Sequence, residues 1–285
     1  MPDLRPMGLG EVLDGALTIF RRHFLLFVKI GAVALWLPVA LVIYINLSGG
    51  RPQHVGLALV ASIVQYFAGL FLTASAIRVI SDSYLGHEPQ LGDAISLGAS
   101  KIWPLFVVGL GKGIILGLIA MGIGVVAAIM IPLMITGGAG GVAVLAAIIA
   151  VVGGSWLLAF VACGYAVTTP IVVLENLSSS SDALGRSWSL TRDFKLKIFG
   201  IFFVTGLMVY LPVLMLGAIG EFLALRTPGV GQGFEVVAGA LPIVLTPLLS
   251  CVLTLVYYDL RVRREGFDLQ VLSEQLSTMT TGVNG

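Results

Sequence analysis

Long apolar runs alternate with short polar segments along this chain, and the alternation predicts its architecture. The apolar runs lie near residues 24–46, 55–77, 113–135, 142–173, 198–220 and 236–258. An α-helix needs about 20 predominantly apolar residues to cross a hydrocarbon layer ~30 Å thick, so each run is long enough to span a membrane. No segment shows the alternating polarity of a membrane-spanning strand. The pattern predicts an all-α, polytopic helical membrane protein with six transmembrane helices.

The composition agrees with this fold class. Hydrophobic residues make up 58% of the 285 residues and charged residues only 11%, whereas soluble domains carry roughly 25% charged residues. A water-soluble fold of this length would lack the charge to cover its surface. The net charge of +1 indicates no nucleic-acid partner. Cys163 and Cys251 lie inside apolar runs without a CxxC spacing, which is typical of buried free thiols.

The basic residues predict the orientation of the chain. With six spans both termini lie on one side, together with the segments near 78–101 and 178–197. This side holds 13 of the 16 basic residues: Arg5, Arg21, Arg22, Lys29, Arg78, Lys101, Arg186, Arg192, Lys195, Lys197, Arg261, Arg263 and Arg264. Short loops rich in Lys and Arg stay in the cytoplasm. We therefore expect both termini to be cytoplasmic in a bacterial inner membrane. Cytoplasmic anchors at anionic lipid headgroups are expected at Arg21, Arg22, Arg261, Arg263 and Arg264.

A weak internal repeat divides the single membrane domain, 1–285, into three units. Glu11, Asp93 and Asp182 each open a short segment whose apolar residues recur at helical spacing, and two spans follow each segment. The units cover about 9–80, 91–174 and 181–260. The repeat predicts three hairpins, each preceded by an interfacial amphipathic helix. The remaining segment, 261–285, is expected to form a cytoplasmic amphipathic tail.

Gly109, Gly113 and Gly117 recur at every fourth position of the third apolar run. Small residues at this spacing allow another helix to approach closely. The neighbour is either a helix of the same chain or a second copy in a homodimer. The spacing alone leaves both interpretations open, and internal packing is the simpler one.

Candidate chemistry is sparse. The 15 acidic residues fall in loops, termini or the ends of spans, and His23, His54 and His87 lie in different loops. Metal-binding spacings such as HExxH, nucleophile elbows such as GxSxG and phosphate loops are missing from the sequence. The sequence therefore predicts no enzyme, no cofactor and no metal site.

Lys112 is the one candidate cation within a long apolar stretch. It lies 19 residues after Asp93, as Lys29 lies 18 residues after Glu11 and Lys197 lies 15 after Asp182. This recurrence indicates a lysine at the membrane boundary that extends its ammonium towards headgroups. The alternative is a buried cation that contacts a substrate or partner, and it needs a backbone carbonyl or a lipid phosphate as acceptor.

Both ends of the chain resemble a bacterial membrane family. Residues 4–7 (LRPM), 9–14 (LGEVLD) and 20–24 (FRRHF) are similar to its start, and residues 257–263 (YYDLRVR) and 265–269 (EGFDL) are similar to its end. The family is the membrane domain associated with glycerophosphoryl diester phosphodiesterases. The resemblance implies an all-helical inner-membrane protein. Phosphodiesterase residues are not carried over, because the chain has no His-Arg-Gly catalytic motif.

Three functions are compatible with these features. The first is a non-catalytic scaffold or accessory subunit that supports a membrane-protein partner. The second is a transporter or lipid-handling protein, whose route would pass between the hairpins. The third, a membrane enzyme that acts on lipid, rests on the family association alone.

The topology is testable with reporter fusions. Fusions after Gly285 and within 178–181 are expected to report the cytoplasm, and fusions at Gly49 or Gly138 the periplasm. Alkaline phosphatase and fluorescent-protein activities would measure this. A periplasmic signal from the C-terminal fusion would contradict the six-span topology.

Overall fold

The computed structural model describes residues 5–48, 54–136, 140–177 and 179–266, and all regular structure within these ranges is helical. The helices follow in chain order: α1 (Leu9–Arg22), α2 (Phe24–Leu47), α3 (Val55–Tyr84), α4 (Leu91–Ile135), α5 (Gly141–Gly164), α6 (Thr168–Leu174), α7 (Asp182–Thr191), α8 (Lys195–Ala224) and α9 (Pro228–Glu265). The all-α prediction is confirmed. The predicted tail lies, from residue 267 onward, outside the described residues.

Six stretches among the described residues are long and apolar enough to cross a membrane. They are Phe24–Ile45, Val55–Tyr84, Leu91–Met134, Gly141–Leu174, Lys195–Ala224 and Leu245–Glu265. The chain is therefore a multi-pass membrane protein, as the hydrophobic pattern predicts. Several helices run beyond the apolar segments that predicted them. Asp82 and Asp259 consequently lie on α3 and α9, although the sequence indicated loops or the outermost ends of spans.

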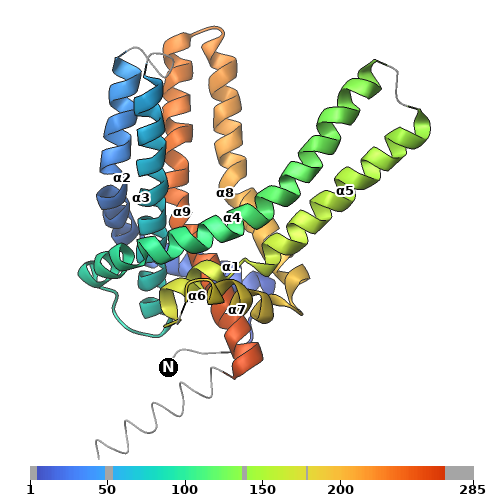
Figure 1. Ribbon diagram of the computed structural model, residues 1–285. Helices are drawn as coiled ribbons and strands as arrows, with labels where there is room; N and C mark the ends of the chain where they lie inside the picture. The colour runs from blue at the N-terminus through green and yellow to red at the C-terminus, as the bar shows by residue number, and fades with distance from the viewer. Residues whose placement is uncertain (1–4, 49–53, 137–139, 178, 267–285) are drawn as a thin grey trace, which may run out of the picture.

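Figure 1 shows two groups of helices above a common base. Helices α2, α3, α8 and α9 stand side by side, while α4 and α5 pack on each other and lean away as a separate pair, here called the arm. Helices α1, α6 and α7 and the last turns of α9 form the base. Consecutive helices α2–α3, α4–α5 and α8–α9 are neighbours. The division into three repeated units remains a prediction.

One predicted break between helices is absent and one unpredicted break is present. The segment 91–102 was expected to be a separate interfacial helix, but it continues through Pro104 into the span as a single helix of 45 residues, α4. Conversely, the run 142–173 is interrupted between α5 and α6. The Gly164 carbonyl at the end of α5 accepts hydrogen bonds from the Ser187 and Thr191 hydroxyls, at 2.9 and 3.0 Å. Side chains of α7 thus satisfy a carbonyl that the helix end leaves free.

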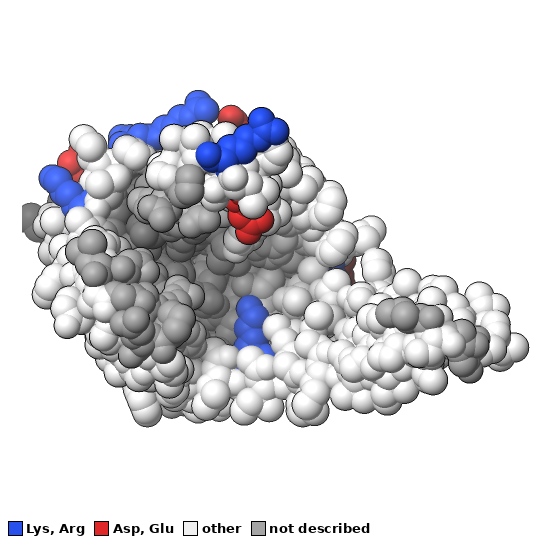
Figure 2. All heavy atoms as spheres, turned by 90° about the horizontal axis from the view of Figure 1, so that it is seen from above, with Lys and Arg blue, Asp and Glu red and all other residues white. Residues whose placement is uncertain are grey.

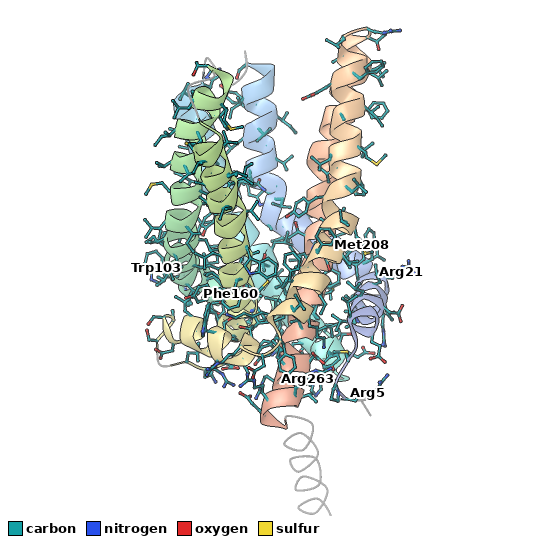
Figure 3. The ribbon with its side chains drawn as sticks, turned by 90° about the vertical axis from the view of Figure 1, so that its right-hand side faces the viewer. Arg5, Arg21, Trp103, Phe160, Met208 and Arg263 are labelled. Carbon is teal, nitrogen blue, oxygen red and sulfur yellow. The ribbon has the colours of Figure 1, made fainter. Side chains whose placement is uncertain are left out.

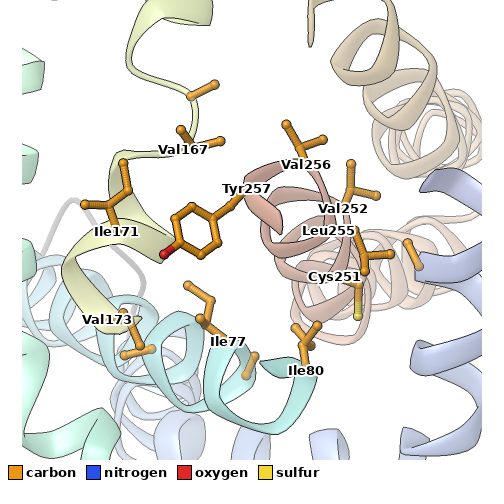
Figure 4. Packing of buried hydrophobic residues seen from close by; sticks show 14 of the residues in the cluster. Ile77, Ile80, Val167, Ile171, Val173, Cys251, Val252, Leu255, Val256 and Tyr257 are labelled. Carbon is orange, nitrogen blue, oxygen red and sulfur yellow. The ribbon is translucent and has the colours of Figure 1, made fainter. Parts of the chain in front are cut away.

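Helix α9 supplies much of the core at the base. Its Tyr257 is fully buried, and its ring points between α3 and α6, where Ile77, Val167 and Ile171 surround it (Figure 4). In the membrane-spanning window of α9, 72% of the residues are buried, whereas none are in the window of α4. The polypeptide therefore encloses α9 and leaves the arm largely uncovered.

Helix α1 packs against protein rather than lying free. Val12 and Ala16 have no exposed surface. A Cβ atom added at Gly15 would lie 3.2 Å from Leu255 of α9, and one added at Gly200 of α8 would lie 3.2 Å from Leu9. The apolar face of α1 thus covers α8 and α9. Its expected position at the membrane interface remains a prediction.

Helices α3 and α4 pack closely at Gly98, and this contact allows a test of the packing. A Cβ added at Gly98 would overlap the Ser75 hydroxyl and lie 3.2 Å from the Phe71 carbonyl. Overpacking of this kind costs typically 1–3 kcal/mol. We expect Gly98→Ala to lower the thermal midpoint of the detergent-purified protein, measured by intrinsic fluorescence.

Gly92→Ala is the matched control on the same helix, because no atom lies within 4 Å of its added Cβ. Alanine is favoured over glycine in a helix by roughly 1 kcal/mol, so this variant should be unchanged or more stable. Adding Ser75→Ala to Gly98→Ala should restore part of the loss. An unchanged midpoint for Gly98→Ala alone would show that the two helices are further apart.

Candidate functional site

Many charged residues of the base belong to one of two groups of hydrogen bonds and ion pairs. The first group surrounds Asp259. Asp259 of α9 is only 2% exposed. Its carboxylate accepts hydrogen bonds from the Met7 backbone N–H at 2.7 Å, from Lys197 Nζ at 2.6 Å and from Arg263 Nε at 3.0 Å. Lys197 and Arg263 also donate to the Met7 carbonyl, at 2.7 and 2.9 Å. This Asp259 clamp ties the start of the chain to α8 and α9.

The second group joins α6, α7 and α9 and is here called the Glu175 network. Arg186 of α7 bonds both Glu175 oxygens, at 2.9 and 3.2 Å, and contacts Glu265 of α9 at 2.6 Å. The buried Tyr257 hydroxyl donates to Glu175 at 2.9 Å, and Arg261 pairs with Glu265 at 3.1 Å. Two carboxylates thus face two guanidinium groups and a phenol.

Hydrogen bonds and neighbouring charges stabilise the charged forms of Arg186 and Glu11, whereas burial disfavours the charged form of His23. Hydrogen bonds to Glu175 raise the pKa of Arg186 above its ordinary value, with a smaller contribution from Glu265. At the start of α1, a hydrogen bond from the Gly8 backbone N–H lowers the pKa of the exposed Glu11 carboxyl, and Arg5 lowers it further. Partial burial lowers the pKa of His23, whose Nε2 lies 2.9 Å from the Ser83 hydroxyl.

These contacts change the interpretation of the predicted anchors. Figure 3 places Arg5, Arg21 and Arg263 in the lower part of the molecule, towards the base. Arg21 and Arg22 are exposed on α1. Arg261 and Arg263 instead pair with acids of their own helix, and Arg264 pairs with Asp193. Lys197, expected to extend towards headgroups, belongs to the Asp259 clamp; that expectation was wrong because a buried carboxylate lies within its reach.

Lys112 has a protein acceptor. Its Nζ lies 3.3 Å from the carbonyl oxygen of Tyr165, at the break between α5 and α6. The Thr168 hydroxyl donates to the same oxygen at 2.8 Å. Lys112 therefore links α4 to the base through a backbone carbonyl, as the alternative to headgroup contact requires. A contact of Lys112 with a substrate or a partner stays a prediction.

The predicted glycine seam is only partly enclosed by the chain. A Cβ at Gly109 would lie 3.1 Å from the Tyr66 hydroxyl of α3, but no atom lies within 4 Å of an added Cβ at Gly113 or Gly117. Among the described residues, internal packing is therefore wrong for Gly113 and Gly117, which are exposed on α4. The homodimer interpretation stays a prediction at these two positions.

The clamp and the network hold helices together. Each of their carboxylates is neutralised by a neighbouring cation. Within the described ranges, no three His, Cys, Asp or Glu side chains are close enough to share a metal ion. Cys163 and Cys251 are buried and unpaired. The sequence contained a signal for part of this arrangement, since Asp259 and Arg263, and Arg261 and Glu265, are four residues apart on one helix. The contacts to Met7, Glu175 and Arg186 carried no local signal.

The burial of Asp259 allows a matched test of the clamp. Removing one partner of a buried ion pair typically costs about 3–5 kcal/mol, because the remaining charges stay buried without compensation. We expect Asp259→Asn to lower the free energy of unfolding by an amount of this order, measured by denaturant titration of the detergent-purified protein. Asp193→Asn breaks a pair whose carboxylate is 66% exposed and should cost about 1 kcal/mol or less. Equal effects of the two substitutions would contradict a structural role for the clamp.

The comparisons with known proteins leave the family open. No family model, no curated protein and no solved structure matches this chain. The resemblance at the two ends therefore stays an expectation from the sequence. The function has to be argued from the geometry of the helices and from their charges.

Proposed function

We propose that this multi-pass membrane protein is a non-catalytic scaffold or accessory subunit that supports a partner protein in the bacterial inner membrane, with both termini cytoplasmic. The proposal rests on the exposure of the arm. None of the residues in the membrane-spanning window of α4 is buried by the rest of the chain. Seen from the end opposite the base, the described surface is largely uncharged and is hollowed beside the arm (Figure 2).

The exposed small residues of α4 support a helix as the partner. Gly113 and Gly117 are exposed, and a Cβ added at either would meet nothing within 4 Å. In lipid, helices associate through close packing at small residues rather than through the hydrophobic effect. A partner's transmembrane helix can approach the arm closely at these two positions. Lipid alone needs no such small residues.

The distribution of charge supports a non-catalytic role. The carboxylates of Asp259, Glu175 and Glu265 are engaged by basic side chains in the Asp259 clamp and the Glu175 network. Catalytic acids and bases normally need an accessible position next to a substrate. The likeness of residues 4–24 and 257–269 to a phosphodiesterase-associated membrane domain fits this role, because that domain is separate from the catalytic one.

A lipid-handling function is the second candidate, and one specific observation favours it. The surface is hollowed beside the arm (Figure 2), and an apolar cavity containing one lysine lies where α5 meets α8. Lipid binding there is compatible with a scaffold, since many membrane proteins bind lipid between their helices.

Purification of the tagged protein from its native membranes tests the scaffold proposal. We expect a stoichiometric membrane-protein partner with the wild-type chain. Gly113→Leu with Gly117→Leu should reduce its recovery about tenfold, which corresponds to ~1.4 kcal/mol of binding free energy. Quantitative mass spectrometry of the purified complex provides the measurement.

Gly122→Leu is the matched control, because Gly122 is also open on α4 but lies five residues from Gly117 and therefore on another face. It should leave recovery unchanged. Recovery of a second, differently tagged copy in place of another protein would assign the seam to a homodimer. A partner that is retained equally by all three proteins would refute the arm as its binding surface.

A further inference from the structure

Lys195 differs from the other lysines near the base in its surroundings. It is the first residue of α8, and only 9% of its surface is exposed. Its ammonium lies 3.5 Å from the ring centroid of Phe160 on α5 and 3.5 Å from that of Trp188 on α7. It is therefore held between two aromatic faces at the point where the arm meets the rest of the molecule.

The aromatic faces attract the charge but accept few of its hydrogen bonds. An ammonium group has three N–H donors and no acceptor. Lys101, Lys112 and Lys197 each donate to a carbonyl or carboxylate oxygen, at 3.0, 3.3 and 2.6 Å. For Lys195, no oxygen acceptor lies within hydrogen-bond distance among the described residues, and its Nζ is not sealed from the surface. Lysines are almost never fully buried unless they are paired, and the Lys195 ammonium has surface left to accept a partner.

An apolar cavity of about 150 Å³ lies beside Lys195, whose apolar stem forms part of its wall. Its other walls are Trp156, Ala159, Phe160 and Cys163 from α5, and Leu196 and Phe199 from α8. An apolar cavity of similar size can hold a benzene-sized group, so it can take a segment of an acyl chain but not a whole lipid. Both walls belong to membrane-spanning helices.

The charges beside the cavity select an anionic occupant. Arg192, three residues before Lys195, is exposed at the end of α7 and adds a second cation. A second groove, lined by Phe20, Phe27, Trp36 and other apolar residues of α1, α2 and α9, contains no charged side chain. The stem of Lys195 thus lines an apolar cavity, and the ammonium at the end of that stem has no oxygen partner among the described residues.

We infer that Lys195 and the α5–α8 cavity bind an anionic phospholipid. The phosphate accepts hydrogen bonds from the Lys195 ammonium and lies beside Arg192, and one acyl chain enters the cavity between α5 and α8. The charged base lies where a membrane places its headgroups, since the six spans extend from it. Buried basic side chains commonly reach headgroups in this way. The lipid fills the junction between the arm and the rest of the protein. This site is separate from the exposed glycines on which the proposed partner contact depends.

Quenching by brominated lipid tests the site directly. Trp36 and Trp103 are exposed, so Trp36→Phe and Trp103→Phe in the full chain leave Trp156 and Trp188 beside the cavity as reporters. Phosphatidylglycerol brominated in its acyl chains is added to detergent micelles that contain the protein. We expect saturable quenching, at concentrations about fivefold lower than with brominated phosphatidylcholine. Fivefold is the preference that about 1 kcal/mol from one basic side chain would give.

Two lysine variants separate a specific site from general attraction to anionic lipid. Lys195→Gln should abolish the fivefold preference. Lys29→Gln removes the same charge from an exposed position of α2 and should keep it. If Lys195→Gln prevents folding, Arg192→Gln, which should weaken the preference, takes its place. Equal quenching by both lipids in the unmodified background, or a preference that survives Lys195→Gln, would overturn the inference.

Inorganic phosphate distinguishes a lipid site from an anion site. Added alone at millimolar concentration, it should neither change the fluorescence of Trp188 nor displace the brominated lipid. Displacement by free phosphate would assign the site to a soluble anion and contradict the role of the apolar cavity. Because Gly113 and Gly117 are unchanged throughout, these results do not depend on the proposed partner.

Discussion

The Asp259 carboxylate is the interaction on which the organisation of the base depends. It is nearly inaccessible and binds a backbone N–H and two cations from three segments of the chain. A carboxylate in such a position is stable only with this many partners, because the cost of removing it from water is otherwise several kcal/mol. The clamp therefore fixes Met7, α8 and α9 relative to one another. Helix α1 follows directly from Met7, so its apolar face is directed onto α8 and α9.

Membrane proteins gain little from burying apolar side chains against each other, since lipid is as apolar as their interior. The polar contacts of the base supply specificity that apolar packing alone does not. The Glu175 network joins α6 and α7 to α9, and Lys112 joins α4 to the break before α6. The Glu175 network lies near helix ends, and Lys112 reaches from the middle of α4 to the carbonyl of Tyr165 at the end of α5. Among the described residues, no ion pair lies in the upper halves of the helices, where the arm separates from the other spans.

The hydrophobic pattern was sufficient for the fold class and for the six spans, because hydrocarbon thickness imposes a length that a single sequence displays. It failed where tertiary contacts decide the local structure. Pro104 did not separate an interfacial helix from α4, and the continuous run 142–173 gave no sign of the break at Gly164, which side chains of α7 stabilise. The glycine spacing located small residues but not their neighbours. Two of the three face away from the chain's own helices.

The charges at the base were predicted as a group, and the structure adds contacts that the sequence pattern did not indicate. Arginines that the pattern assigned to headgroups pair with acids, because α9 brings Asp259 and Glu265 within one turn of them and folding adds Glu175 and Asp193. Lys195 carried no signal of its own among thirteen basic residues on that side. Only the convergence of α5, α7 and α8 shows that two aromatic rings, rather than a carboxylate, surround its ammonium. An ammonium group with no oxygen acceptor from the protein, placed where helices meet, can take its acceptor from the phosphate of a membrane lipid.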